Sequence, residues 1–203
     1  SLLLAAARGT EILLSEPDLD RAIEMVLGVV GEASAQDRFC IFEFHPDSSG
    51  EGTFSSMRYE WTRPGQRMID RDASMQNIDM VTVFPGLLER LEAGKYLSGT
   101  LSEFTEDGRR LWEPFGVKAV LLAPIRVEGR LWGTAGFHNC RDEIHWDPAD
   151  LAILETSAAS LGVAIARARS ARALAETNEQ LRAAAERADA ANRAKGEFLA
   201  NMS

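Results

Sequence analysis

Cysteine and histidine are the side chains with which this sequence could bind a metal or carry out redox chemistry. The two cysteines are Cys40 and Cys140, and the three histidines are His45, His138 and His145. Metal sites and redox-active thiol pairs usually need closely spaced ligands, such as a C-x-x-C motif, and the sequence has none. We therefore predict no metal site and no catalytic residue. Both cysteines are predicted to be buried thiols in a reducing cytoplasm.

A second set of residues suits binding. Aromatic side chains recur in predicted strands and in the segment between them, together with a histidine and two glutamates as polar anchors. Apolar walls with a few converging polar groups are typical of small-molecule sites, although aromatic residues in strands are more often part of the core. The candidate ligand-pocket residues are Phe42, Glu43, Phe44, Glu60, Trp61, Phe84, Phe104, Trp112, Phe115 and His138.

The elements that must position these residues follow from hydrophobic periodicity and turn signals. Helices are predicted at both ends of the chain, the second of them with Asp18 as its N-cap. Four strands lie between them, the last two joined by a tight turn at Glu128-Gly129. The expected helices are 2–14, 19–33, 84–93, 106–113 and one from 148 onward, and the expected strands are 38–44, 53–61, 118–127 and 130–140.

This order of elements predicts the α+β fold class. Short hairpin connections imply antiparallel pairing, and the terminal helices are expected to share one face of the sheet. The inserted segment between the two strand pairs should cover the other face. Few polar residues interrupt 119–125, which indicates a central strand that is buried on both faces.

Charge and composition exclude several classes of partner. The formal net charge is −9, and 45% of the residues are hydrophobic. A negative field repels nucleic acid phosphates and anionic lipids, so we predict neither a nucleic acid partner nor direct membrane contact by this segment. No unbroken apolar run is expected to reach the ~18 residues that cross a bilayer. The predicted location is the cytoplasm.

Four segments together resemble the GAF domain family. They are RFCIFEFH at 38–45, RYEW at 58–61, GVKAVLLAPI at 116–125 and GRLWGTAGF at 129–137. The resemblance covers about residues 19–166. It implies a PAS-related, six-stranded antiparallel sheet with helices on both faces. It also implies a small-molecule pocket on one face and dimer-forming helices on the other.

The segment RAKGEFLANMS at 193–203 resembles the start of the dimerisation and phosphoacceptor helix of histidine kinases. In that family a His-Glu pair follows directly. The resemblance implies that the parent protein is an ATP-dependent protein histidine kinase of a two-component system, with a kinase domain downstream and a response regulator as partner. The segment 1–203 is not expected to be an enzyme by itself, because its sequence contains neither the phosphoacceptor histidine nor the ATP-binding domain.

A continuous helix from Pro148 to Ser203 would be roughly 80 Å long. Its second half carries a coiled-coil pattern, which predicts a parallel homodimer through the terminal helices. The seam residues are Leu174, Leu181, Ala188, Phe198 and Met202. The expected parts of the chain are an N-terminal helix and linker at 1–17, the GAF-like sensor domain at 18–166, a coiled-coil signalling helix at 167–192 and the start of the kinase helix at 193–203.

The resemblance leaves the ligand open. The Asn-Lys-Phe-Asp-Glu signature of cyclic-nucleotide-binding relatives is absent, and 77–116 contains no cysteine for covalent bilin attachment. Among the histidines, His138 is the best candidate axial ligand for haem. A methionine sulfoxide reductase activity would need a third cysteine. We therefore predict an unknown small-molecule ligand and no certain cofactor, and keep as alternatives a ligand-free dimerisation module and a haem- or bilin-type gas or light sensor.

Overall fold

The computed structural model describes residues 2–202, apart from the exposure of Gly196 and the side chains of Leu199 and Ala200. These parts and Ser203 belong to the segment 193–203 that resembles the kinase helix, and they lie outside what the structure describes. The elements are α1 (Leu2–Ser15), α2 (Leu19–Ala33), β1 (Arg38–His45), β2 (Phe54–Thr62), η1 (Ala73–Met75), β3 (Ile78–Asp79), α3 (Met80–Val83), α4 (Leu87–Glu92), β4 (Leu97–Thr100), η2 (Leu101–Glu103), α5 (Glu106–Trp112), η3 (Glu113–Phe115), β5 (Ala119–Val127), β6 (Arg130–Asn139) and α6 (Pro148–Asn201).

The six strands form one antiparallel sheet in the order β3-β2-β1-β6-β5-β4. This confirms the α+β fold class and the six-stranded sheet. The turn between β5 and β6 has positive φ at both of its residues, Glu128 and Gly129, as a two-residue hairpin requires. The predicted strand pairs β1–β2 and β5–β6 both form. The edge strands β3 and β4 were not predicted from the sequence pattern, because they have only two and four residues.

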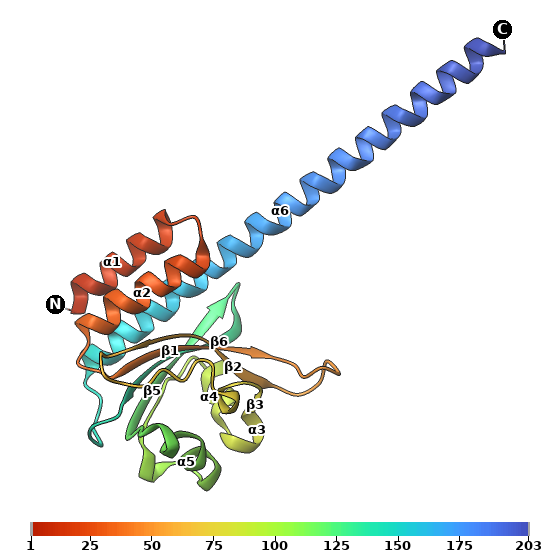
Figure 1. Ribbon diagram of the computed structural model, residues 1–203. Helices are drawn as coiled ribbons and strands as arrows, with labels where there is room; N and C mark the ends of the chain where they lie inside the picture. The colour runs from red at the N-terminus through yellow and green to blue at the C-terminus, as the bar shows by residue number, and fades with distance from the viewer. Residues whose placement is uncertain (1, 203) are drawn as a thin grey trace. The chain divides into compact units, whose positions relative to one another are not determined.

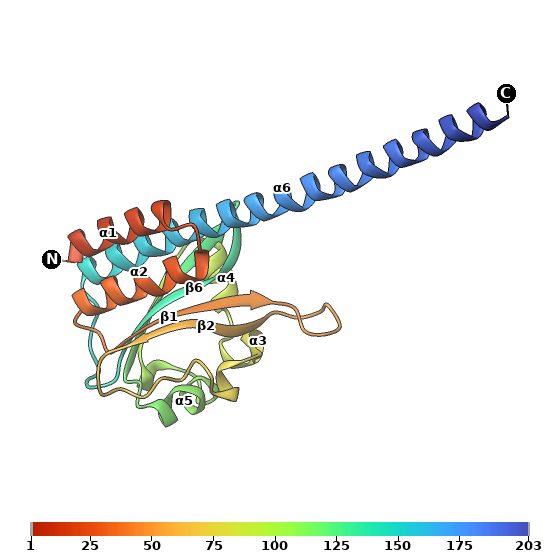
Figure 2. The same ribbon diagram turned by 45° about the horizontal axis from the view of Figure 1, so that its top comes forward.

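One face of the sheet is covered by α2 and the first part of α6, and α1 packs against α2 (Figure 1 and Figure 2). Asp18 caps α2 as predicted, since its side chain accepts a hydrogen bond from Arg21 N at 3.0 Å. The backbone of α6 approaches β5 so closely that a Cβ on Gly162 would lie 2.1 Å from the carbonyl oxygen of Arg126. A glycine is therefore required where this helix crosses the strand.

The segment Pro148–Lys195 includes one stretch that is long and apolar enough to cross a membrane by length and composition alone. No unbroken apolar run of this length was expected from the sequence. Its apolar side chains include Leu154 and Leu161, which are fully buried in the domain core. Burial against the sheet accounts for this composition, because the core helix of a domain meets the same criterion.

The other face of the sheet is covered by the short helices between β2 and β5, with α3, α4 and α5 prominent in Figure 1. The helix expected at 84–93 is shorter and begins only at Leu87, as α4, after Gly86, which has a φ of +79°. The preceding turn, α3, lies before the expected range and was not predicted. The residues of this layer form one apolar cluster with the sheet: Cys40, Phe42, Met57, Ile69, Met75, Ile78, Met80, Leu87, Leu91, Trp112, Val117, Val120 and Leu122.

The chain divides into two compact units, residues 1–165 and residues 166–203. The second unit is the C-terminal part of α6, and every side chain described in it after Ala168 is exposed. The seam positions Leu174, Leu181, Phe198 and Met202 are 62%, 63%, 62% and 71% exposed. Large apolar side chains are thus left open to solvent along this helix.

Candidate ligand site

A small apolar cavity lies between the sheet and the layer of short helices. Its volume is about 20 Å³, which is little more than the space of one water molecule. The rings of Phe42 and Trp112 meet edge to face beside it, with centroids 6.1 Å apart. The lining residues are Phe42, Ser55, Ile78, Met80, Phe84, Leu87, Trp112, Leu122 and Thr134. We call this space the inner cavity.

A larger and more open pocket of about 280 Å³ lies at the surface of the same layer. Its apolar wall includes Phe84 and Phe104, whose rings are 6.2 Å apart and nearly perpendicular. Two charged side chains, Arg90 and Glu103, also line it. The full lining is Phe84, Pro85, Gly86, Leu87, Arg90, Leu97, Glu103, Phe104 and Thr105. We call this space the outer pocket.

Phe84 and Leu87 line both spaces, so these two side chains separate the inner cavity from the outer pocket. Phe84 lies in the break between α3 and α4, and Leu87 is the first residue of α4. The two spaces therefore share a wall, with mainly apolar side chains on its inner side and two charged side chains on the rim of the outer pocket.

A buried ion pair lies on the same face of the sheet as the inner cavity. Arg38 on β1 and Glu60 on β2 approach to 2.6 Å, and their side chains are 1% and 0% exposed. Each also anchors the loop after β2: Arg38 donates to the carbonyl of Arg67 at 2.7 Å, and Glu60 accepts from the amides of Ile69 at 2.6 Å and Asp70 at 2.9 Å. Burial raises the pKa of Glu60, although these hydrogen bonds and Arg38 oppose the effect.

His138 and Cys40 lie next to each other on this face of the sheet. The His138 ring packs against Trp112 with centroids 4.5 Å apart, and its Nδ1 is 4.0 Å from the Cys40 sulfur. Burial, together with the nearby Arg38 charge, lowers the pKa of His138 to about 3. Burial also raises the pKa of Cys40 well above its usual value. The histidine is therefore neutral and the thiol protonated and unreactive at neutral pH.

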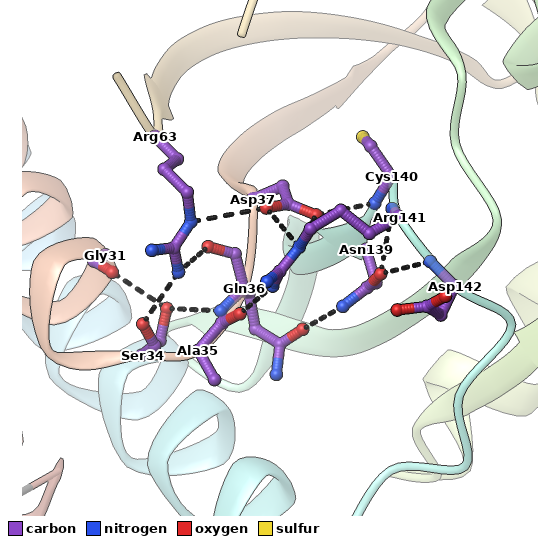
Figure 3. Close-up of polar contacts among 10 residues, drawn as sticks. All are labelled: Gly31, Ser34, Ala35, Gln36, Asp37, Arg63, Asn139, Cys140, Arg141 and Asp142. Carbon is purple, nitrogen blue, oxygen red and sulfur yellow. Dashed lines mark hydrogen bonds and ion pairs between the residues drawn. The ribbon is translucent and has the colours of Figure 1, made fainter. Parts of the chain in front are cut away.

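A polar network ties one end of the sheet to the terminal helices (Figure 3). Its centre is the fully buried Asp37, whose carboxylate accepts from Cys140 N at 2.8 Å and pairs with Arg63 at 3.2 Å and Arg141 at 3.0 Å. The same two arginines donate to the carbonyls of residues 34–36, just after the C-terminal end of α2. Gln36 in turn donates to Asp150, at the start of α6, at 3.4 Å.

The structure brings several of the predicted pocket residues together. Phe42, Phe84 and Trp112 line the inner cavity, and Phe104 lines the outer pocket. Phe44 packs against the same apolar cluster.

Four predicted pocket residues on this face, Phe44 among them, line neither space. His138 packs against Trp112, and Glu60 is occupied by Arg38 and the loop after β2. Phe115 lies under the guanidinium of Arg67, 5.8 Å from it, in a separate surface groove.

Two predicted pocket residues lie on the opposite face. Trp61 packs directly on Gly31 of α2, where an added Cβ would be 2.3 Å from its ring, so it belongs to the helix-covered face. Glu43 accepts a hydrogen bond from Arg58 at 2.8 Å and alternates along β1 with Phe42, so it also points to that face. On β2 the alternation of faces shifts at a bulge between Met57 and Tyr59, so counting along the strand did not place Trp61. Glu43 was assigned to the pocket against the simple alternation along β1.

The charged residues of the outer pocket were missed by sequence reasoning. Arg90 was not distinguishable from other surface arginines. Glu103 had a local signal, because Thr100 and Glu103 have the T-x-x-E spacing of a capping box, and this capping box forms. Knowing the turn would still not have placed Glu103 beside α4.

Neither space accommodates a bilin or haem as it stands. A linear tetrapyrrole, with its four rings, is at least as large as the drug-sized ligands that occupy pockets of roughly 300–1,000 Å³. The two spaces have volumes of about 20 and 280 Å³, so neither would admit it without movement of the covering layer. Cys40 is buried in mid-strand and the half-buried Cys140 directly follows β6, and neither thiol lines the outer pocket. Haem bound through His138 would need the space that the Trp112 ring now occupies, with its centroid 4.5 Å from that of the histidine. Within residues 2–202, no three His, Cys, Asp or Glu side chains cluster as a metal site would require.

The GAF domain family model matches residues 18–165. The chain is 31% identical over 202 residues to the methanogenesis regulatory histidine kinase FilI of Methanothrix harundinacea, covering 100% of this chain and 23% of that protein. It is 30% identical over 212 residues to the circadian input-output histidine kinase CikA of Synechococcus elongatus, covering 92% and 28%. The chain thus spans about a quarter of the length of these relatives.

Solved structures with the same fold include bilin-bound domains. The phycocyanobilin-bound GAF domain from a cyanobacterial phytochrome superposes with a TM-score of 0.66 at 19% identity, covering 83% of this chain and 95% of that one. GAF3 from Slr1393 of Synechocystis sp. PCC6803 has a TM-score of 0.64 at 20% identity, covering 77% and 99%. The family match and the fold agree, and the chain belongs to the GAF domain family.

Proposed function

We propose that this chain is the signal-input part of a cytoplasmic, dimeric two-component histidine kinase. A small molecule binds between the sheet and the short helices, and the terminal helices transmit its binding to the downstream kinase domain, which phosphorylates a response regulator. Support comes from the family, from two relatives that are histidine kinases, and from the inner cavity and outer pocket. Allosteric coupling of about 1–3 kcal/mol would change kinase output roughly 5–150-fold.

The single observation that carries the dimer is the exposed apolar seam of α6. Leu174 and Leu181 are 62% and 63% exposed and one heptad apart. Soluble helices rarely leave such a row of leucines open to water unless a partner covers it. A parallel coiled coil would bury these positions in the dimer.

Cysteine cross-linking tests this arrangement in a Cys140→Ser background, which removes the half-buried native thiol. Under mild oxidation, Leu174→Cys and Leu181→Cys are expected to give disulfide-linked dimers in high yield. Glu179→Cys and Glu186→Cys, on the opposite side of the heptad, serve as matched controls and should cross-link poorly. Equal yields at all four positions, or a monomer by light scattering at micromolar concentration, would refute the parallel coil.

Signal transmission is tested in the full-length parent kinase. Insertion of one residue after Ala184 rotates the following helix by about 100° and should strongly change autophosphorylation. Insertion of seven residues keeps the heptad phase and should change it less. A kinase that tolerates the single insertion, yet responds to substitutions in the outer pocket, would rule out rotation through this helix.

A second function, a dimerisation module without a ligand, is favoured by one observation. The inner cavity of about 20 Å³ is almost filled by the domain's own side chains. Native mass spectrometry of the purified protein distinguishes the two functions, because a bound small molecule supports the sensor. An absorbance spectrum checks the remaining alternative, since a visible band would indicate haem or a bilin.

A further inference from the structure

The outer pocket has opposite charges at its opening and an apolar wall. Arg90 comes from α4 and Glu103 from η2, and both line the same space of about 280 Å³. No ion pair joins these two side chains within the part of the chain that the structure describes. Two unlike charges on one small pocket, not neutralised by each other, complement a ligand that carries both charges.

Arg90 is held in place and still has donors to offer. Its Nε donates to the carbonyl of Tyr96 at 2.6 Å, which orients the planar guanidinium. Its Nη1 and Nη2 groups make no hydrogen bond to residues 2–202. A guanidinium with two adjacent free N–H groups suits a carboxylate, because both oxygens can accept in parallel.

Glu103 is fixed in a similar way. Its Oε2 accepts from the amide of Thr100 at 2.7 Å and from the Thr100 hydroxyl at 3.2 Å. These hydrogen bonds lower the pKa of Glu103, so the carboxylate is charged at neutral pH. Its Oε1 makes no hydrogen bond to the described residues. This oxygen could accept from an ammonium group.

Between the two charges, the wall is apolar. Phe84 and Phe104 form an edge-to-face pair, and Leu97 completes this side of the pocket. Beyond Phe84 and Leu87 lies the inner cavity, which is lined mainly by apolar side chains. An apolar substituent would therefore find contact area at the wall.

We propose that the outer pocket binds a small zwitterion with an apolar side group, which is the chemistry of a free apolar α-amino acid. Its carboxylate contacts Arg90, its ammonium contacts Glu103, and its side group packs on Phe84 and Phe104. The volume of about 280 Å³ favours a ligand of this size, because it lies just below the roughly 300–1,000 Å³ of pockets that hold drug-sized ligands. This inference rests on the proposed sensor function and names the ligand class for it.

Calorimetric titration of the purified chain tests the proposal with four matched probes. L-phenylalanine carries both charges, whereas L-phenylalaninamide and 2-phenylethylamine lack the carboxylate and 3-phenylpropanoate lacks the ammonium. L-phenylalanine is expected to bind, and each of the other three to bind at least about tenfold more weakly, equivalent to ~1.4 kcal/mol.

Two substitutions assign the charges. Arg90→Gln should weaken L-phenylalanine binding by about tenfold or more and make it similar to that of the amide. Glu103→Gln keeps an oxygen for the Thr100 capping bonds and should make L-phenylalanine bind as weakly as 3-phenylpropanoate. Arg71→Gln and Glu89→Gln, both exposed and outside the pocket lining, are the controls and should leave binding unchanged. Circular dichroism verifies that all four variants are folded.

Three outcomes would overturn the inference. Equal binding of a singly charged probe would exclude recognition of both charges. Unchanged binding in Arg90→Gln and Glu103→Gln would place L-phenylalanine elsewhere. Absence of binding at millimolar L-phenylalanine and L-leucine would exclude the amino acid class. None of these outcomes decides the proposed sensor function. That function is tested separately, by native mass spectrometry for any other bound molecule and by cross-linking of the C-terminal helix.

Discussion

Asp37 is the residue whose replacement most directly tests the polar network at the end of the sheet. Its buried carboxylate accepts from the Cys140 amide at 2.8 Å and pairs with Arg63 and Arg141. Asp37→Ala removes the side chain that joins all three groups. The amide loses its acceptor, and both guanidiniums lose their counter-charge.

The magnitude follows from how exposed the partners are. Loss of one partner from a fully buried ion pair costs about 3–5 kcal/mol. Here the side chains of Arg63 and Arg141 are 39% and 52% exposed, so water and the carbonyls after α2 can partly replace Asp37. The orphaned amide adds roughly 1–3 kcal/mol. We therefore expect a loss of about 2–4 kcal/mol in the free energy of unfolding, below the sum of the two costs because of this exposure.

Urea unfolding followed by tryptophan fluorescence measures this loss, and thermal unfolding should show a fall in Tm of roughly 2–4 °C per kcal/mol for a chain of this size. Asp37→Asn keeps an oxygen for Cys140 and should lose about half as much. Asp107→Ala, which removes an exposed ion pair with Arg110, is the control and should cost less than about 1 kcal/mol. If Asp37→Ala is as stable as this control, the network contributes nothing that water cannot replace.

Three further predictions concern the core. Gly162→Ala should lower the free energy of unfolding by about 2 kcal/mol or more, because the added Cβ would meet the Arg126 carbonyl. Gly28→Ala has open space around its Cβ and should raise this free energy by up to ~1 kcal/mol in the same urea assay. Equal effects of the two substitutions would contradict the close crossing of α6 and β5. Glu60→Gln should cost about 3–5 kcal/mol by leaving the buried Arg38 unpaired, and a smaller loss than in Asp37→Ala would refute this ranking. Burial lowers the pKa of His138 to about 3 in the folded state, so the neutral ring contributes stability above pH ~6.5 that is lost as the pH falls toward 3. About 2 kcal/mol of this is lost by pH 5. His138→Gln should therefore reduce the dependence of the free energy of unfolding on pH between 6.5 and 5, and an unchanged dependence would assign it to other groups.

Hydrophobic periodicity was sufficient for the elements with strong local signals. Helix α2 begins and ends where predicted, because Asp18 supplies its cap and its apolar face repeats at helical spacing. Strands β5 and β6 were predictable from their apolar runs and from the Glu128-Gly129 turn. These features are local, so the sequence around each of them determines its conformation.

The inserted layer was less predictable because its structure depends on contacts distant in the sequence. Strand β4 pairs with β5 through residues such as Leu97 and Leu122, but its four residues carry no clear period. The orientation of Trp61 depends on the space that Gly31 leaves in α2. The outer pocket likewise requires α4 and η2 to lie side by side, which neither segment specifies alone.

The buried pair of Arg38 and Glu60 has a consequence for sequence variation in the neighbouring loop. Both side chains hold the loop by its main chain, at the carbonyl of Arg67 and the amides of Ile69 and Asp70. Main-chain groups are the same whatever side chain is attached, so exposed positions such as Arg67 can diverge without shifting the backbone. Related domains could thus alter the chemistry of the groove beside Phe115 while inheriting an unchanged scaffold.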